Sequence, residues 1–265
     1  MRRFLLSPSL LLFIVVVVVS LHGQGSLRDE LDQAVQAYKA ARYDEATQHF
    51  RNAIALDPQN VQAHLYLATA YAQQYIPGVD NAENNHLADD AISEYQTVLQ
   101  IDPRSMDSMK GIASLHLQSK RFGEARSSYR KALVLDPNDP EIYYSIGVID
   151  WTQAYTKRMP VFETLHLSQD QPLINKPECW QVRSANETFV KDGMEMLTKA
   201  MQLRPDYDDA MAYMNLMYRE QANIQCSDPT SYQSDIQAAD HWVDLVMATK
   251  KAKAAKADHS PQKAQ

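Results

Sequence analysis

The chain has 265 residues, of which 45% are hydrophobic and 22% are charged, and its formal net charge is −7 at pH 7. This is the composition of a globular protein with enough apolar material for a sizeable core. The acidic balance argues against nucleic acid and anionic membranes as partners, because nucleic acid needs clustered cations against its phosphates. Only 7 residues are glycine and helix-forming residues are plentiful, which predicts an almost wholly helical protein.

The N-terminal segment carries the pattern of a secretory signal. Arg2 and Arg3 precede an apolar run over residues 10–19. The small residues that follow are Ser20, Gly23 and Gly25. A basic start, an apolar run and small residues predict a signal peptide over residues 1–25, and hence an exported chain, periplasmic or secreted. The alternative is an uncleaved inner-membrane anchor, since residues 5–21 come close to the length of a spanning helix, about 20 residues.

One helix ending recurs four times along the chain. The four copies are Ile54-Ala-Leu-Asp-Pro58, Leu99-Gln-Ile-Asp-Pro103, Leu133-Val-Leu-Asp-Pro137 and Met201-Gln-Leu-Arg-Pro205. Proline ends a helix because it lacks the backbone N–H and disfavours helical conformation in the residue before it. Small, large and small residues stand 12, 8 and 5 positions before each proline, on one helix face. They are Ala46, Phe50 and Ala53; Ala91, Tyr95 and Val98; Ala125, Tyr129 and Ala132; and Gly193, Leu197 and Ala200.

A second helix precedes each of these endings. Its apolar positions are Ala34; Leu67, Ala68 and Tyr71; Ile112 and Ala113; and Ile146 and Gly147, with a fifth copy over residues 211–218. The link at residues 42–46 recurs at residues 121–125, where an aromatic and a turn or cap residue precede Glu-Ala. This link marks the start of the second helix of a pair.

The helix-pair pattern over about residues 27–218 resembles tetratricopeptide repeat proteins, whose unit is a 34-residue helix–turn–helix. The resemblance implies an all-α solenoid of about five helix pairs. We expect repeats at about 27–60, 61–105, 106–139, 140–207 and 208–250, within a solenoid over 26–250, and a disordered tail over 251–265. The segments 147–151 and 203–215 also look like those of uncharacterised exported tetratricopeptide repeat proteins of soil acidobacteria, a resemblance that implies no activity.

Unequal spacing between the repeated prolines predicts insertions. The spacing is 34 residues from Pro103 to Pro137, but 45 from Pro58 to Pro103 and 68 from Pro137 to Pro205. We therefore expect long loop insertions at about 73–89 and 156–183, with a further irregular stretch over 223–234. Residues 184–187, Ser-Ala-Asn-Glu, fit a capping box that opens the next helix. Loops of one type emerge along the same edge of a solenoid, so these segments should share a rim, which is either functional or neutral surface drift.

The two cysteines, Cys179 and Cys226, both lie in these irregular segments. Adjacent repeats place the two segments side by side, and export brings the chain into an oxidising compartment. We expect a Cys179–Cys226 disulfide. The alternatives are two free thiols or a metal site, and the lack of histidine at ligand spacing argues against metal.

An aromatic stripe supplies the candidate binding residues. Tyr144, Val148 and Trp151 follow i, i+4, i+7 spacing on a first helix, the stripe that lines the groove in the repeat family. Matching positions in the other copies are Leu31, Val35 and Tyr38; Leu65, Thr69 and Ala72; and Lys110, Ser114 and Leu117. The predicted partner-binding residues are Tyr38, Tyr144, Trp151 and Tyr155. Alternatively, Trp151 and Tyr155 pack under the 156–183 insertion. Val35, Thr69 and Ser114 stand where some family members use asparagine to clamp a carboxylate, so such a clamp is not expected.

The sequence offers no enzyme signature, since it lacks a Gly-rich phosphate loop, a Gly-x-Ser-x-Gly motif and a His-Glu-x-x-His motif. We therefore expect no catalytic activity, cofactor or metal. The predicted function is a protein–protein interaction scaffold of the bacterial cell envelope that binds a protein or peptide through the groove, the insertion rim or both. The alternatives are a membrane-anchored component of an envelope assembly and an enzyme with a site in segment 156–183.

Overall fold

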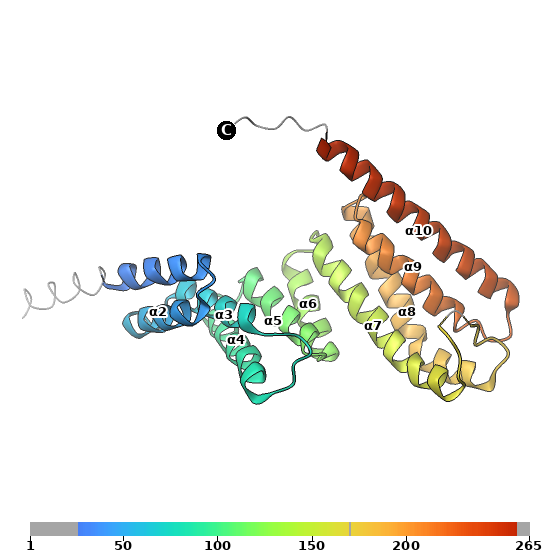
Figure 1. Ribbon diagram of the computed structural model, residues 1–265, viewed down its shortest axis with the longest axis horizontal. Coiled ribbons are helices and arrows are strands. Elements are labelled where there is room, and N and C mark those ends of the chain that lie inside the picture. Colours follow the sequence, from blue (N-terminus) through green and yellow to red (C-terminus); the bar gives the residue numbers. More distant parts are fainter. Residues whose placement is uncertain (1–25, 170, 259–265) are drawn as a thin grey trace, which may run out of the picture. The chain divides into compact units, whose positions relative to one another are not determined.

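The computed structural model describes residues 26–169 and 171–258, and in these residues helices and their connections account for the whole fold, without a strand (Figure 1). The predicted signal segment 1–25 and the tail residues 259–265 lie outside them. A helical segment over 26–39 is followed by α2 (Tyr43–Leu56), α3 (Val61–Gln74), α4 (Ala82–Ile101), α5 (Met106–Gln118), α6 (Phe122–Leu135), α7 (Pro140–Thr164), α8 (Pro177–Leu203), α9 (Asp208–Ala222) and α10 (Pro229–Asp258). The expected all-α class is confirmed. Within the described ranges, no helix is both long and apolar enough to span a membrane.

Two compact units divide the chain, Met1–Arg121 and Phe122–Gln265. We call them unit 1 and unit 2. The described part of unit 1 holds the 26–39 segment and α2 to α5, and that of unit 2 holds α6 to α10. Each unit has its own buried core.

The helix ends follow the predicted signals. α2, α4, α6 and α8 each end two residues before one of the four repeated prolines. Several starts are capped by a side-chain oxygen that accepts a hydrogen bond from a backbone N–H of the first turn. The caps are Asn60 to Ala63, Asn81 to Asn84, Ser105 to Ser108, and Asp139 to Glu141.

The small–large–small face packs as its spacing predicts. In unit 1, Ala46, Phe50 and Ala53 of α2 are buried, and Tyr95 of α4 lies over Gly111 of α5. A Cβ added at Gly111 would stand 2.5 Å from the Tyr95 ring, so only glycine lets α5 approach this closely. In unit 2 the same device recurs, with Gly147 of α7 against the Leu197 side chain of α8, 2.6 Å from an added Cβ.

The expected long loops are mostly helix, and this part of the prediction was wrong. α7 continues through Pro160 to Thr164, and α8 already begins at Pro177, well inside the predicted 156–183 loop. A proline inside a helix costs about 3 kcal/mol. Ala154, Arg158 and Phe162 recur every four residues and are all buried, so burial of this face outweighs the cost of Pro160. Likewise α4 begins at Ala82 rather than after residue 89.

Three further boundaries differ from expectation. Residues 184–187 do not open a helix, because they lie inside α8, where the buried Asn186 donates from its Nδ2 to the Ala154 carbonyl at 2.8 Å. The irregular stretch expected over 223–234 shortens, because α10 begins at Pro229. The tail expected from residue 251 is helical as far as Asp258, where α10 ends. The Lys253 side chain of this last stretch bonds to Asp208 of α9, a long-range contact that favours the helix over a disordered tail.

Candidate binding sites

A cavity of about 320 Å³ opens in unit 1 along the predicted stripe. We call it the unit 1 pocket. Its lining residues are Val35, Tyr38, Lys39, Phe50, Leu65, Tyr66, Thr69, Tyr95 and Asp107. Four of these were predicted as stripe positions from the family spacing: Val35, Tyr38, Leu65 and Thr69. Lys39 and Tyr66 each directly follow a stripe residue. Phe50 lies on α2, Tyr95 on α4 and Asp107 on α5, so stripe spacing alone could not identify them.

Aromatic rings form much of the pocket. Phe50 is 1% exposed, and its ring centroid lies 5.8 Å from that of Tyr66, which is 37% exposed. Tyr38 packs edge-on against Tyr43 at 5.5 Å. Burial raises the pKa of Tyr38, so its phenol remains neutral at physiological pH. The exposed ring of Tyr66 beside the buried ring of Phe50 gives an apolar surface that a ligand can reach.

One side of the pocket is polar, and its proton donors are already used. The Thr69 hydroxyl donates to the Leu65 carbonyl oxygen at 2.8 Å and lies 3.2 Å from the Tyr95 hydroxyl. A hydroxyl carries a single proton, so Tyr95 must be the donor in its contact with Thr69. Burial raises the pKa of Tyr95, which keeps that proton in place. The two hydroxyl groups therefore have lone pairs to offer a ligand but no free proton.

Two charged groups of the pocket have no partner ion. Among residues 26–169 and 171–258, neither the Lys39 ammonium nor the Asp107 carboxylate forms an ion pair or a side-chain hydrogen bond. Both side chains are exposed, so water solvates them in the free protein. Their charges are available to a bound ligand.

A smaller cavity of about 250 Å³ adjoins the unit 1 pocket and shares Val35 and Tyr66 with it. Its other lining residues are Leu27, Arg28, Leu31, Asp32 and Gln62. Arg28 and Asp32 pair at 3.8 Å on the exposed surface, so they largely neutralise one another. Leu31, a predicted stripe residue, thus lines an extension of the same surface.

The other three predicted anchors lie together in unit 2. The ring centroids of Trp151 and Tyr155 are 5.3 Å apart, in a stacked arrangement. Two tyrosines that the sequence reading missed pack onto this stripe: Tyr213 of α9 lies 5.4 Å from Trp151, and Tyr207 lies 5.0 Å from Tyr144. Burial raises the pKa of Tyr144 to about 12. Tyr144, Trp151 and Tyr155 remain predicted partner-binding residues. Part of each ring is covered by another ring: Tyr144 by Tyr207, and Trp151 by Tyr155 and Tyr213.

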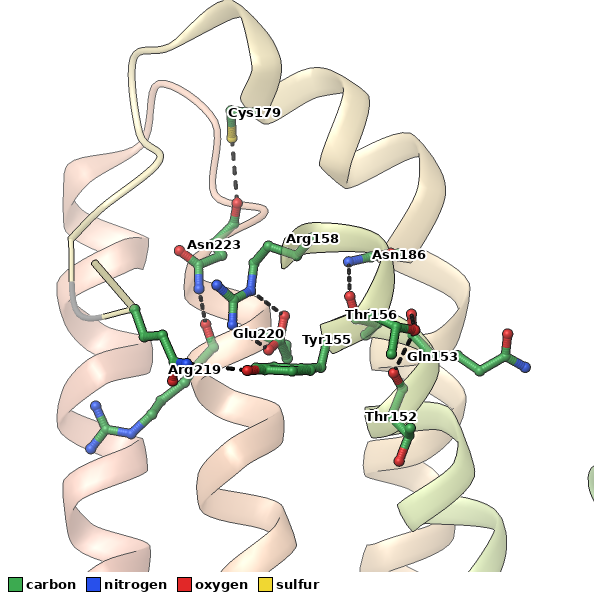
Figure 2. A network of polar contacts seen from close by, with 12 residues as sticks. Thr152, Gln153, Tyr155, Thr156, Arg158, Cys179, Asn186, Arg219, Glu220 and Asn223 are labelled. Carbon is green, nitrogen blue, oxygen red and sulfur yellow. Dashed lines mark hydrogen bonds and ion pairs between the residues drawn. The ribbon is translucent and has the colours of Figure 1, made fainter. Parts of the chain in front are cut away.

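A buried ion pair supports the far end of this aromatic stripe. Arg158 of α7 donates from Nε and Nη2 to the two oxygens of Glu220 of α9, at 2.8 and 2.9 Å, and the two side chains are 5% and 3% exposed. Figure 2 shows the Arg158 guanidinium pointing at the Glu220 carboxylate beside the Tyr155 ring. The Arg158 Cζ lies 4.3 Å from the centroid of Phe162. Gln169 donates to the Tyr155 hydroxyl at 3.1 Å, a contact with the 156–183 segment of the kind that the packing alternative expects.

The predicted disulfide is present. Cys179 and Cys226 are joined, with their Cα atoms 5.6 Å apart across 47 residues of sequence. Both sulfurs are buried, and the bond ties the first turn of α8 to the connection between α9 and α10. The disulfide joins α8 to the connection after α9, and the Arg158–Glu220 pair joins α7 to α9, both at the same end of unit 2.

A second charged cluster joins α6, α7 and α8. Asp150 is 0% exposed and pairs with Arg126 at 2.9 Å, while the same arginine reaches Asp192 at 2.6 Å. Burial raises the pKa of Asp150 to about 6, and the nearby Arg126 opposes that rise. The cluster is closed to solvent on the Asp150 side, which suits a structural contact rather than a catalytic acid. In the part of the chain that the structure describes, no three His, Cys, Asp or Glu side chains are grouped to hold a metal.

Comparison with known proteins identifies the repeats. A family model described as a TPR repeat matches residues 42–74 and 113–153. The general transcriptional corepressor ssn6 of Schizosaccharomyces pombe is 31% identical over 108 residues, which is 40% of this chain and 9% of that protein. The chain spans between 9% and 22% of the length of the curated relatives it matches. The resemblance to exported acidobacterial proteins is not addressed by these matches and stays a prediction.

Solved structures share the fold at low sequence identity. Residues 41 to the end of MamA from Desulfovibrio magneticus RS-1 align with a TM-score of 0.58 at 13% identity, covering 86% of this chain and 96% of that one. YrrB, described as a TPR protein with an unusual peptide-binding site, aligns with a TM-score of 0.52 at 12% identity, covering 84% and 90%. Identities this low establish a common helical-repeat fold and leave the binding partner open.

Proposed function

We propose, from the premise that this chain contains tetratricopeptide repeats, that it is a non-enzymatic scaffold which binds a protein or peptide partner in the unit 1 pocket. The repeat fold implies a role in protein–protein interaction, and the pocket supplies a place for it. The observation that carries the proposal is an apolar, aromatic cavity on the predicted stripe, with reachable rings and two unpaired charges. Binding sites are commonly concave and apolar, with a few polar groups that orient the ligand.

The aromatic stripe of unit 2 is a less favourable binding site than the unit 1 pocket. Its stripe residues Tyr144 and Trp151 already contact Tyr207 and Tyr213, so a partner gains less by covering them. The segment 156–183, where an enzyme site was the alternative, contributes Arg158, Phe162 and Leu173 to buried contacts. This supports a structural role for that segment and favours the scaffold over the enzyme.

The place of action is proposed as the cell envelope, on the strength of the signal pattern in residues 1–25. The proposal takes the N-terminal segment as cleaved; its alternative is a retained anchor that holds the repeats at the membrane. The acidic charge of the chain fits a protein partner better than a nucleic acid.

One experiment tests function and location together. The full chain, with an affinity tag after Gln265, is expressed in its own organism and captured from the soluble and membrane fractions. Three forms are compared: wild type, Tyr66→Ala and Trp151→Ala. A partner that wild type and Trp151→Ala retain and Tyr66→Ala loses supports the unit 1 pocket. A partner lost only with Trp151→Ala would move the site to unit 2. Intact mass of the captured chain reports cleavage.

A further inference from the structure

The hydrogen-bonding groups of the unit 1 pocket restrict the kind of side chain that it accepts. Thr69 and Tyr95 have committed their protons, Thr69 to the Leu65 carbonyl and Tyr95 to Thr69. Asp107, an acceptor when ionised, adds a further set of lone pairs from α5. We call Thr69, Tyr95 and Asp107 the acceptor wall. A ligand without a donor would bury this wall without satisfying it, and an unsatisfied polar group is costly to bury.

The rest of the pocket favours a flat aromatic group. Phe50, Tyr66 and Tyr38 present rings, and aromatic pairs gain from tilted or edge-on contact beyond the area that they bury. The cavity of about 320 Å³ would hold about ten water molecules at about 30 Å³ each, which is enough room to admit a two-ring side chain.

The charge of Lys39 bears on the kind of ligand that the pocket accepts. Lys39 alone contributes an ammonium to the lining, and it has no partner ion within the described part of the chain. A lysine or arginine side chain could also donate to the acceptor wall, but Lys39 would repel it while Asp107 attracts it, so the two charges together give a cationic ligand no net advantage. An electron-rich ring would instead attract the ammonium over its face.

We propose that the unit 1 pocket binds a tryptophan side chain of a protein partner, with the indole ring among Tyr38, Phe50 and Tyr66 and the indole N–H donating to the acceptor wall. Tryptophan carries one donor, no acceptor and no charge, which complements a wall that lacks free donors and a rim that holds a cation. The inference rests on the proposed function of this pocket and adds the chemistry of its partner.

The test uses two peptide probes that differ by one methyl group. Both are acetylated and amidated, with the sequence Gly-Ser-Gly-Ser-X-Ser-Gly-Ser-Gly, where X is tryptophan or 1-methyltryptophan. The methyl group removes the indole N–H and keeps the ring. Binding to the full chain is measured by protein-observed NMR titration at millimolar peptide. We expect the tryptophan peptide to bind about three- to tenfold more tightly, which corresponds to one net hydrogen bond.

Two variants assign the difference to the pocket. Tyr95→Phe combined with Asp107→Ala removes most of the acceptor wall, and it should bring the two peptides to nearly equal affinity. Lys39→Gln should weaken both peptides by about two- to fivefold, because both keep the ring that the ammonium attracts. Tyr75→Phe is the matched control: this unit 1 tyrosine is buried but does not line the pocket, and it should leave both affinities unchanged. Thermal unfolding checks that each variant is folded.

The outcomes separate the two proposals. Equal affinity of both peptides for the wild type overturns the tryptophan inference and leaves the pocket as a binding site. A preference for tryptophan that survives in the acceptor-wall variant also overturns it. If neither peptide shifts the resonances of the pocket residues, both the inference and the proposed function of this pocket fail.

Discussion

The same helix stripe lines a cavity in unit 1, where we call it open, and packs against rings of the next helix pair in unit 2, where we call it covered; its residues are partly exposed in both units. On α3, Leu65 and Thr69 line a cavity, and the α5 residue that reaches it is Asp107. On α7, Tyr144 and Trp151 meet the rings of Tyr207 and Tyr213 from the start of the next helix pair. Equivalent positions in a repeat therefore line a cavity or pack against other rings according to the side chains that the following repeat brings to them.

Unit 2 also carries a disulfide and two ion pairs between its helices. Arg158–Glu220 joins α7 to α9, Cys179–Cys226 joins α8 to the connection after α9, and Arg126–Asp150 joins α6 to α7. Unit 1 keeps its aromatic lining partly exposed, with Tyr66 at the surface. The comparison predicts that substitutions in unit 2 act mainly on stability, whereas those in the unit 1 pocket act mainly on binding.

The largest effect is expected for Glu220→Ala. It leaves the Arg158 guanidinium buried without its carboxylate, and breaking a buried pair in this way costs about 3–5 kcal/mol. Urea unfolding gives the loss, and backbone hydrogen exchange shows whether it falls in unit 2. The double variant Arg158→Met, Glu220→Leu is the control, because it removes both charges, and it should recover most of the loss. A loss in unit 1 of similar size would contradict the comparison.

Removal of the disulfide should have the next largest effect. Cys226→Ser frees a chain segment of 47 residues and should lower the free energy of unfolding by about 2–4 kcal/mol. Wild-type protein unfolded in the presence of a thiol reductant should lose the same amount, while the variant should not respond to reductant. A wild type indifferent to reductant would show that the bond contributes little.

Asp150 should give unit 2 an unusual dependence on pH. Its pKa is about 6 in the folded protein, against an ordinary value of 3.8, so the folded state binds more protons between these values. The free energy of unfolding should therefore fall as pH rises through this window, by up to about 3 kcal/mol from this group. Asp150→Asn should remove that fall in urea titrations between about pH 4 and pH 7.

The control for this prediction is Asp192→Asn, which removes the other carboxylate from Arg126 and keeps Asp150. It should keep a fall of reduced size, because the negative charge of Asp192 contributes to the raised pKa of Asp150. Parallel stability curves for wild type and Asp150→Asn would show that the buried carboxylate does not titrate in this range.

The smallest effect on stability is expected for Tyr66→Ala. This ring is 37% exposed, so its loss should lower the free energy of unfolding by about 1 kcal/mol or less, while it removes a wall of both cavities. Trp151→Ala should cost more, about 2–4 kcal/mol, because it opens space beside Tyr155 and Tyr213. If Tyr66→Ala destabilised the chain as much as Trp151→Ala, the distinction between open and covered stripes would be lost.

Local signals were enough to predict the repeated framework. Helix ends before Pro58, Pro103, Pro137 and Pro205, and the small–large–small face, depend on residues within one or two turns of each other, so a single sequence shows them. The Cys179–Cys226 disulfide could also be predicted from the sequence, because repeat geometry brings neighbouring loops together and the chain has only two cysteines.

The sequence by itself thus determined the helical class, the repeat and the position of the stripe. Only the tertiary structure decided whether α7 runs through Pro160, which acid pairs with Arg126, and which part of the stripe stays open. Asp150 and Asp192 stand 24 and 66 residues from Arg126, and Phe50, Tyr95 and Asp107 reach the unit 1 pocket from three different helices. Such contacts depend on the volume and charge of side chains that meet only after the helices pack, and no periodicity along the chain records them.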